Sequence, residues 1–119
     1  MFRCFLTAKL HRLVITECDL DYVGSITLDR DLLELSGILL DERVLVADLR
    51  SGARFETYVM EGEPGSGTVC INGAAARLVD RGDRIIVMQF SWIDTAVEVS
   101  PGARVVVAND ENLEPRLLQ

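Results

Sequence analysis

The sequence predicts a single, mainly β domain with short helical connections, and three observations lead to this prediction. Six or seven short runs of apolar and β-branched residues are separated by Gly, Pro and Asp, which is the pattern of strands and turns. No long helical period and no internal repeat of fixed length is present. A length of 119 residues suits one domain with one core. The pattern alone favours a small β-barrel or sandwich.

The first half of the chain contains most of the expected strands. These are residues 2–5, 10–16, 24–28, 43–49 and 54–60. The last two runs flank a short loop that contains Gly52, so we expect them to form a hairpin. Between the third and fourth runs, Asp29 is expected to cap a short helix that ends at Gly37. The apolar side of this helix is formed by Leu32, Leu33 and Leu35.

The second half is rich in breakers. We expect a loop over residues 61–67, a strand over 68–71, a short helical stretch over 74–79 and a turn over 80–83. Two further strands are expected over residues 84–90 and 104–108. The polar tail, residues 109–119, is expected to be loose.

Charge and composition exclude several classes of protein. The net charge of −7 argues against a nucleic-acid-binding protein, because phosphate contacts need a basic surface. No apolar run is long enough for a membrane span or a cleaved leader, and three scattered cysteines suit a reducing compartment. We therefore expect a cytoplasmic protein. A hydrophobic content of 49% is high for an acidic chain and favours a surface that meets other subunits.

Lys9 and His11 are the single lysine and the single histidine of the chain. One histidine cannot build a multi-histidine metal site, and a lysine that holds a carbonyl cofactor would have to be Lys9. On a strand the two side chains share one face while Leu10 points to the other. Two readings remain open: an exposed polar pair, or a cationic wall for an anionic substrate with an imidazole that titrates near neutral pH.

The pair Gly24 and Ser25 also has two readings. A Gly-Ser pair is usually part of a turn. A serine after glycine can instead attack the preceding carbonyl, replace the peptide bond by an ester and, after elimination and hydrolysis, leave a pyruvoyl group. We expect Gly24 to permit the strained backbone that this attack requires.

Residues 54–58 combine an arginine with a tyrosine. On a strand Arg54 and Tyr58 share a face, where a guanidinium fork matches a carboxylate and a phenol supplies a proton. The alternative is an ordinary exposed charge beside a half-buried aromatic ring. Thr57 would point to the opposite side, so a site that uses both Thr57 and Tyr58 needs a bulge or two neighbouring pockets.

The stretch from Asn72 through Gly73, Ala74 and Ala75 contains only small residues after the asparagine. Such residues allow close backbone approach, and the start of a helix offers N–H groups to an anion. The same stretch would serve equally well as a strand-to-helix turn.

Taken together, these segments resemble the bacterial pyruvoyl-dependent aspartate 1-decarboxylases. The resemblance runs in order along the chain to about residue 108 and is carried by residues 9–12, 19–25, 52–58, 65–67, 72–76 and 82–86. Each motif is weak alone, whereas the whole set at the family's spacing is specific. Asp21, Pro64 and Arg77 stand where members of the family often carry other residues.

The resemblance implies a six- or seven-stranded double-psi β-barrel that assembles as a homotetramer. It implies self-cleavage between Gly24 and Ser25, giving a small chain 1–24 and a large chain 25–119 that begins with a pyruvoyl group formed from Ser25. The implied reaction converts L-aspartate to β-alanine and carbon dioxide for pantothenate and coenzyme A synthesis. Neither a metal nor pyridoxal phosphate is expected, because the pyruvoyl carbonyl supplies the electron sink. A factor that assists maturation is left open.

The resemblance also implies roles for the candidate residues. Tyr58 returns a proton to the substrate carbon, Arg54 and Lys9 bind its carboxylates, and His11 lies near the site. Thr57 and Asn72 act in cleavage and in positioning the Ser25 end. The pocket is lined by the backbone of Gly73, Ala74 and Ala75. The alternative function is a non-catalytic barrel module that binds a protein partner.

Overall fold

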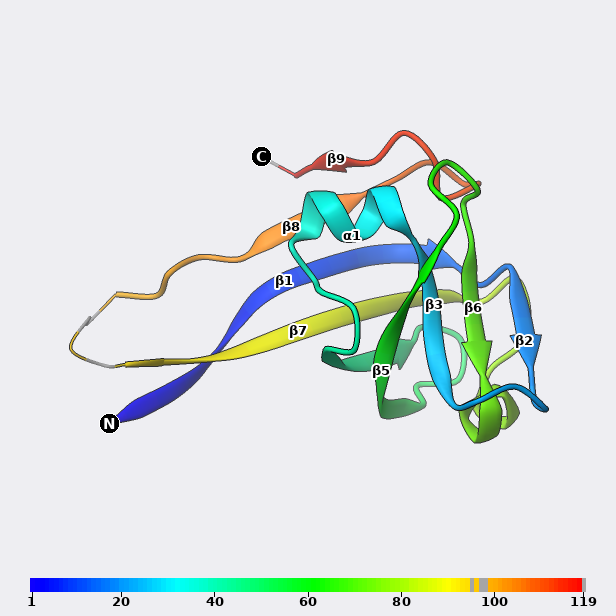
Figure 1. The fold of residues 1–119 in the computed structure, drawn as a ribbon, viewed down its shortest axis with the longest axis horizontal. Coiled ribbons are helices and arrows are strands. Elements are labelled where there is room, and N and C mark those ends of the chain that lie inside the picture. The colour runs from blue at the N-terminus through cyan, green and yellow to red at the C-terminus, as the bar shows by residue number, and fades with distance from the viewer. Residues whose placement is uncertain (95, 97–98, 119) are drawn as a thin grey trace.

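The mainly β class is confirmed, and the strands form one mixed sheet. The computed structural model describes residues 1–94, 96 and 99–118. Within these ranges the sheet has nine strands in the order β2-β6-β3-β5-β4-β7-β1-β8-β9, rather than the predicted six or seven (Figure 1). The strands are β1 (Phe2–Val14), β2 (Glu17–Asp19), β3 (Ser25–Asp29), β4 (Arg43–Asp48), β5 (Arg54–Gly62), β6 (Val69–Asn72), β7 (Arg84–Asp94), β8 (Arg104–Val107) and β9 (Arg116–Leu117).

The longest pairing joins β1 to β7 along an antiparallel ribbon that extends away from the rest of the sheet (Figure 1). The sequence predicts two strands over residues 2–5 and 10–16, but pairing with β7 unites them into one strand of 13 residues. Register shifts follow Leu6 and Leu10, and Arg12 has a φ of 61°. These irregularities bend the strand, which is the usual effect of a β-bulge.

The segment between β1 and β2 links distant parts of the curved sheet. The Ile15 N–H donates to the Asp83 carbonyl at 2.9 Å, just before β7, and the Thr16 N–H donates to the Val69 carbonyl of β6 at 2.8 Å. The sheet therefore bends until β6 and the start of β7 lie on either side of one short segment. The double-psi barrel implied by the resemblance stays a prediction.

The concave side of the sheet holds one hydrophobic core, which α1 (Arg30–Ser36) covers. Its strand residues are almost fully buried and include Leu10, Leu13, Ile26, Leu28, Val44, Val46, Val59, Val69, Ile71, Ile85 and Val87. The helix lies against β1, β3, β5, β8 and β9. As predicted, Asp29 caps it by accepting from the Asp31 N–H at 2.8 Å, and Gly37 ends it with a φ of 81°. None of the helices described is long and apolar enough to cross a membrane.

The predicted hairpin is confirmed as β4 and β5, and the helical stretch after Asn72 is a 3-10 helix, η1 (Gly73–Leu78). Three pairings are parallel: β1 with β8, β2 with β6, and β3 with β5. The pairing of β3 with β5 lays Ile26 beside Val59 and crosses the intervening α1 and β4. This crossing brings Ser25 next to the strand that carries Arg54 and Tyr58.

The expectation of a loose tail is wrong for residues 109–118, while Gln119 lies outside the described residues. β9 pairs with β8, and Asn112 is 1% exposed. The Asn112 side chain accepts from the Val14 N–H and donates to the Val14 and Gly67 carbonyls, all within 2.9 Å. A polar tail is ordered here because one side chain satisfies three backbone groups that would otherwise be buried without partners.

Candidate active site

Ser25 begins β3 and is buried, with 1% of its surface exposed. Its neighbour Ile26 points into the core, so alternation along the strand turns the Ser25 side chain to the outer face of the sheet. The Ser25 Oγ donates to the Val23 carbonyl at 3.0 Å and accepts from the Asn72 Nδ2 at 3.0 Å. The hydroxyl is thus held on the chain segment that contains the predicted cleavage site.

Asn72 ends β6 directly opposite Ser25 in the antiparallel register. Its Nδ2 donates to the Thr27 Oγ1 at 3.0 Å as well as to Ser25, and its Oδ1 accepts from the Cys70 Sγ at 3.1 Å. With 3% of its surface exposed, the amide has a protein partner for each of its polar atoms. We call Ser25, Thr27, Cys70 and Asn72 the Asn72 network.

Gly73 lies against Gly24, the residue that precedes Ser25. Its φ is +74°, and a Cβ at this position would lie 2.6 Å from the Gly24 Cα and 2.9 Å from the Gly24 nitrogen. Gly24, by contrast, has no atom within 4 Å of a would-be Cβ and does not adopt a positive φ. The strained glycine that the sequence analysis assigns to position 24 is found at position 73, because the close backbone approach occurs there.

The register of β4 and β5 decides how residues 54–58 point. Pairing is continuous from Ala47 opposite Arg54 to Arg43 opposite Tyr58. Arg54 and Tyr58 therefore share the outer face, as predicted, and this pairing contains no bulge that would turn Thr57 to join them. Thr57 and Tyr58 nevertheless both line one open cavity of about 330 Å³ with Arg43 and Glu56.

Tyr58 and Ser25 lie at the same level of neighbouring strands. In the parallel pairing of β3 with β5, Ile26 lies beside Val59. Ser25 and Tyr58 each stand one residue earlier on these strands and are therefore aligned with each other. Both side chains point away from the core, since Ile26 and Val59 are fully buried. Neighbouring strands are about 4.8 Å apart, which brings the tyrosine to the edge of the Asn72 network.

Lys9 shares this outer face but lies further along the sheet. It pairs with Met88 of β7, Met88 pairs with Leu45 of β4, and Leu45 pairs with Glu56 of β5. Directly paired residues point to the same face, so Lys9 is on the side of Arg54 and Tyr58, while Leu10 is fully buried as predicted. Three strand spacings separate β1 from β5, on the order of 14 Å along the sheet.

His11 is partly buried, and its Nδ1 is buried without a hydrogen-bond partner. Burial, followed by the charges of Lys9 and Arg12, lowers the pKa of His11 below its usual value. The imidazole is therefore neutral near pH 7. Among the side chains the structure describes, Lys9 and Arg54 have no ion pair.

The small-residue stretch forms η1 rather than a turn alone. Asn72 precedes it but makes no capping bond, because its amide is engaged with Ser25 and Thr27. Ala75 packs against the core, whereas Ala74 is exposed. The contribution of Gly73 to the candidate site is therefore the close approach of its backbone to Gly24.

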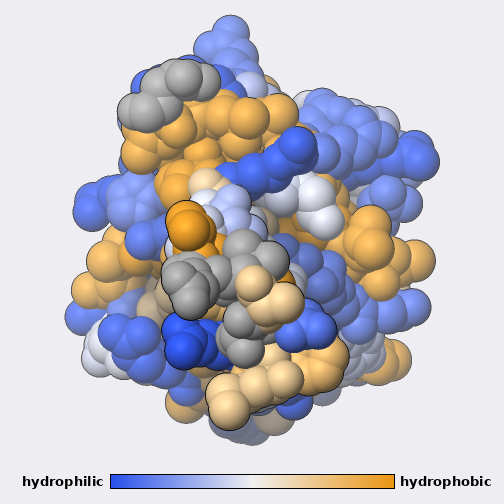
Figure 2. All heavy atoms as spheres, turned by 90° about the vertical axis from the view of Figure 1, so that its left-hand side faces the viewer, coloured by the Kyte–Doolittle hydropathy of each residue, from blue (hydrophilic) through white to orange (hydrophobic). Residues whose placement is uncertain are grey.

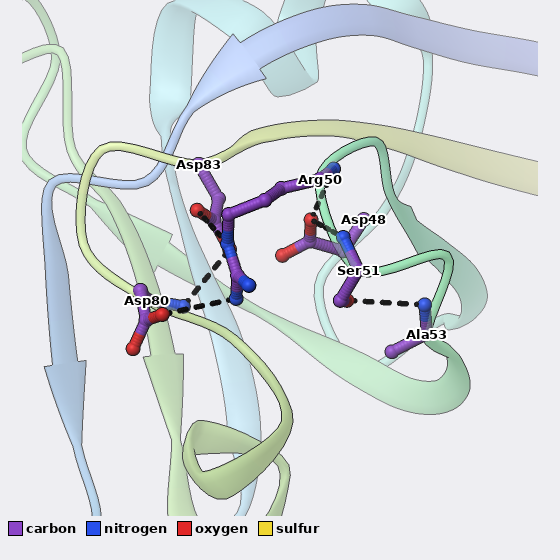
Figure 3. Close-up of polar contacts among 6 residues, drawn as sticks. All are labelled: Asp48, Arg50, Ser51, Ala53, Asp80 and Asp83. Carbon is purple, nitrogen blue, oxygen red and sulfur yellow. Dashed lines mark hydrogen bonds and ion pairs between the residues drawn. The ribbon is translucent and has the colours of Figure 1, made fainter.

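The turn that leads into Arg54 is held by charged groups (Figure 3). The Asp48 Oδ1 accepts from the Arg50 N–H at 2.8 Å, and the Arg50 guanidinium contacts Asp83 at 2.8 Å and Asp80 at 3.0 Å. The hydrogen bond from Arg50 lowers the pKa of Asp83, while burial and the nearby Asp83 raise the pKa of Asp48. We call these four residues the Asp48 cluster.

Sequence reasoning missed Thr27 and Cys70, although a period of two would have found them. Thr27 lies two residues after Ser25 on β3, and Cys70 lies two residues before Asn72 on β6, so both share the outer face. With Tyr22 and Asn72 they line an open cavity of about 250 Å³. Within the described ranges, no group of three or more His, Cys, Asp or Glu side chains is arranged to hold a metal ion.

Comparison with known proteins gives a consistent result. A family model described as Aspartate decarboxylase matches residues 1–114. An aspartate 1-decarboxylase of Caldicellulosiruptor bescii is 48% identical over 117 residues, which cover 98% of this chain and 91% of the relative. The enzymes of that name from Bacillus subtilis and Neisseria meningitidis are 43% and 46% identical, covering 99% and 94% of this chain and 93% and 88% of the relatives.

Proposed function

The chain belongs to the aspartate decarboxylase family, and we propose that it decarboxylates L-aspartate through a pyruvoyl group made from its own Ser25. The activity is that of a carboxy-lyase, which converts L-aspartate to β-alanine and carbon dioxide and supplies pantothenate biosynthesis. The observation that carries the proposal is the buried Ser25 hydroxyl, held between the Val23 carbonyl and the Asn72 amide. A non-catalytic module that binds a protein partner is not favoured, because the family and its relatives are enzymes.

The surroundings of the Gly24–Ser25 bond support self-cleavage. The attack requires the Ser25 Oγ to lie close to the carbonyl carbon of Gly24. The hydrogen bond from this Oγ to the Val23 carbonyl turns the hydroxyl back towards the residues that precede Ser25. The Asn72 Nδ2 donates to the same oxygen and stabilises the negative charge that grows there as the proton leaves. Gly73 has no side chain, which allows the close approach of its backbone to Gly24, the residue that carries the carbonyl under attack.

The proposed maturation balances with one water. The Oγ–carbon bond to Gly24 forms while the Gly24–Ser25 C–N bond breaks, and the hydroxyl proton ends on the Ser25 nitrogen. Loss of the Ser25 Cα proton and of the Gly24 carboxylate then leaves dehydroalanine. Water replaces the nitrogen, ammonia leaves, and the large chain 25–119 begins with a pyruvoyl group. No external oxidant or reductant is needed.

For the decarboxylation itself, the group at position 25 supplies a carbonyl that accepts the electron pair released with the α-carboxylate. We assign binding of the substrate carboxylates to Arg54 and Lys9, which have no competing ion pair among the described residues. Tyr58, at the level of Ser25 on the neighbouring strand, donates the proton that the substrate carbon must regain. A neutral His11 beside Lys9 leaves the lysine as the charged group of that pair.

We further propose that the working enzyme is a homotetramer in the cytoplasm. The candidate side chains lie on the outer face of the sheet, and Lys9 is three strands away from Arg54 within one chain. Phe2, Phe90 and Trp92 are exposed on the β1–β7 ribbon, and Figure 2 shows hydrophobic residues interspersed with hydrophilic ones on this side of the molecule. A second copy would cover such a surface and shield the site from water. The cysteines at positions 4, 18 and 70 are free, which suits a reducing compartment.

Intact-mass analysis under denaturing conditions, together with a β-alanine assay, tests the proposal. We expect two fragments, residues 1–24 and 25–119, with the larger one lighter than a serine-started chain by one ammonia. Ser25→Ala should abolish both cleavage and β-alanine formation, whereas Ser100→Ala, at an exposed serine, should leave both unchanged. A full-length mass that persists on prolonged warming, with no β-alanine formed, would refute the proposal. Cleavage of the purified chain alone would also show that no maturation factor is required.

The role of Tyr58 is tested separately from cleavage. Tyr58→Phe keeps the ring but removes the phenolic proton, so the chain should mature normally and turn over aspartate at least about tenfold more slowly. An unchanged kcat in fully cleaved Tyr58→Phe would remove the tyrosine from its assigned role.

A further inference from the structure

Two residues without a role in the reaction described above, Thr27 and Cys70, both contact the amide of Asn72. We propose that Thr27 and Cys70 are positioning residues for self-cleavage, which fix the Asn72 amide in the orientation that donates to the Ser25 hydroxyl. The inference rests on the proposed function, since it concerns the maturation step of that function.

The sheet register builds this arrangement. Ser25 lies opposite Asn72, and Thr27 lies opposite Cys70, in the antiparallel pairing of β3 with β6. Side chains two residues apart on a strand share a face, so the four residues occupy adjacent corners on the outer side of the sheet. Asn72 therefore has Ser25 across from it, Cys70 beside it on β6, and Thr27 on the diagonal.

An asparagine amide has two orientations of nearly equal shape, related by a half-turn that exchanges Oδ1 and Nδ2. In the observed orientation the two Nδ2 hydrogens go to the Ser25 and Thr27 hydroxyl oxygens, and the Cys70 thiol donates to Oδ1. After a half-turn, Nδ2 would face sulfur, which is a weak acceptor, and Oδ1 would face the two hydroxyls. The Cys70 donor favours the observed orientation, in which the Thr27 hydroxyl gives the second Nδ2 hydrogen a partner.

This orientation decides where the Ser25 proton points. Because Asn72 donates to the Ser25 Oγ, the hydroxyl sends its own hydrogen to the Val23 carbonyl. With the amide reversed, Oδ1 would compete for that hydrogen and would present a partial negative charge to an oxygen that must become nucleophilic. A donor at the same place stabilises the developing charge. The rate of attack on the Gly24 carbonyl should therefore follow the orientation of the amide.

Burial makes Cys70 hard to replace by water, whereas Thr27 is only partly buried. Cys70 is 6% exposed, Asn72 3% and Ser25 1%. Burial raises the pKa of Cys70 to about 11, with the charges of Glu17 and Asp19 adding to the effect. The thiol therefore keeps its hydrogen at neutral pH and acts as a donor rather than as an anionic acceptor.

Two matched pairs of variants test the inference, with the cleavage rate of the full chain measured by intact mass over time and the thermal midpoint measured in parallel. Cys70→Ala removes the donor, and Cys70→Ser restores one in a side chain of similar size. Thr27→Val removes the acceptor at constant shape, and Thr27→Ser restores it. We expect Cys70→Ala and Thr27→Val to slow cleavage about tenfold, the effect of one hydrogen bond, and the two serine variants to cleave close to the wild-type rate.

The outcomes separate this inference from the proposed function. A wild-type chain that stays whole refutes the proposed function and the inference with it. A wild-type chain that cleaves while Cys70→Ala and Thr27→Val cleave equally fast overturns the inference alone. Equal slowing in the alanine and serine variants, in step with the thermal midpoint, would show that Cys70 acts through packing and would also overturn it. If Cys70→Ala does not fold, the Thr27 pair decides by itself.

Discussion

The Asn72 network and the Asp48 cluster are two polar groups, each with a buried centre, that are built on opposite principles. The network is neutral, and the donors and acceptors of its central amide are all matched. The cluster is charged: Asp48 is 2% exposed, and its Oδ2 is buried without a partner (Figure 3). A matched neutral network keeps its geometry over a wide pH range, whereas two carboxyl groups close together depend on protonation. The proposed self-cleavage takes place at the Asn72 network, the one of the two groups whose geometry does not depend on pH.

Two carboxyl groups of the charged cluster, Asp83 and Asp48, change their contributions to stability in opposite directions as the pH changes. The lowered pKa of Asp83 means that it stabilises the fold above its usual pKa of 3.8, and this contribution is lost as the pH falls through the lowered pKa. The raised pKa of Asp48 means that its contribution is present below 3.8 and is lost as the pH rises through the raised pKa. The turn before Arg54 should therefore be weakened at both ends of the range.

Placing a charge in the neutral network should have the largest effect. Asn72→Asp keeps the acceptor for Cys70 but removes both donated hydrogen bonds and buries a carboxylate. We expect cleavage to stop and the free energy of unfolding to fall by about 3 kcal/mol at neutral pH, less at low pH where the new carboxyl is protonated.

Urea denaturation at two pH values measures the effect on stability, and intact mass measures cleavage. Asn72→Ala is the matched control, because it removes the same hydrogen bonds without adding a charge. Maturation of Asn72→Asp at the wild-type rate would contradict the role assigned to the amide.

We expect a smaller loss of stability, and a difference between two sites, when alanine replaces either of two glycines that have a positive φ. Gly73→Ala and Gly82→Ala both force alanine into the left-handed region, at about 1–2 kcal/mol each. Position 82 has open space around it, whereas a Cβ at position 73 meets the backbone of Gly24. Gly73→Ala should therefore cost about 2 kcal/mol more in a thermal unfolding experiment and should also slow cleavage. Equal costs in the two variants would show that the approach of Gly73 to Gly24 is not constrained.

Neutralising the charged cluster should have the smallest effect, with the opposite sign. Asp48→Asn keeps the acceptor for the Arg50 N–H and gives the buried Oδ2 position a donor that faces Asp83. We expect a gain of about 1 kcal/mol at pH 7 that shrinks towards pH 4, because the raised pKa of Asp48 favours the protonated wild-type carboxyl as the pH falls. Asp80→Asn, at an exposed ion pair, should change stability by no more than about 0.5 kcal/mol. A loss of stability in Asp48→Asn across this pH range would show that the Asp48 carboxylate is needed in its charged form.

Local signals in the sequence predicted local structure well. The cap at Asp29, the stop at Gly37 and the hairpin of β4 with β5 are confirmed because each depends on neighbouring residues. The strands β2 and β9 were missed because they are two or three residues long and form only through pairing with β6 and β8. The ordered tail was missed for a similar reason, since Asn112 finds its partners at Val14 and Gly67.

For the candidate site, the sequence by itself determined the chemistry that is available: Ser25 after Gly24, one lysine, one histidine and an arginine and tyrosine at strand spacing. It also determined the family, because several weak motifs occur in one order. Only the tertiary structure decided which of these groups meet. The parallel pairing of β3 with β5 aligns Ser25 with Tyr58, and the pairing of β3 with β6 joins Ser25 to Asn72. Such contacts join segments far apart in the sequence, and their register is set by the shared core rather than by any local pattern.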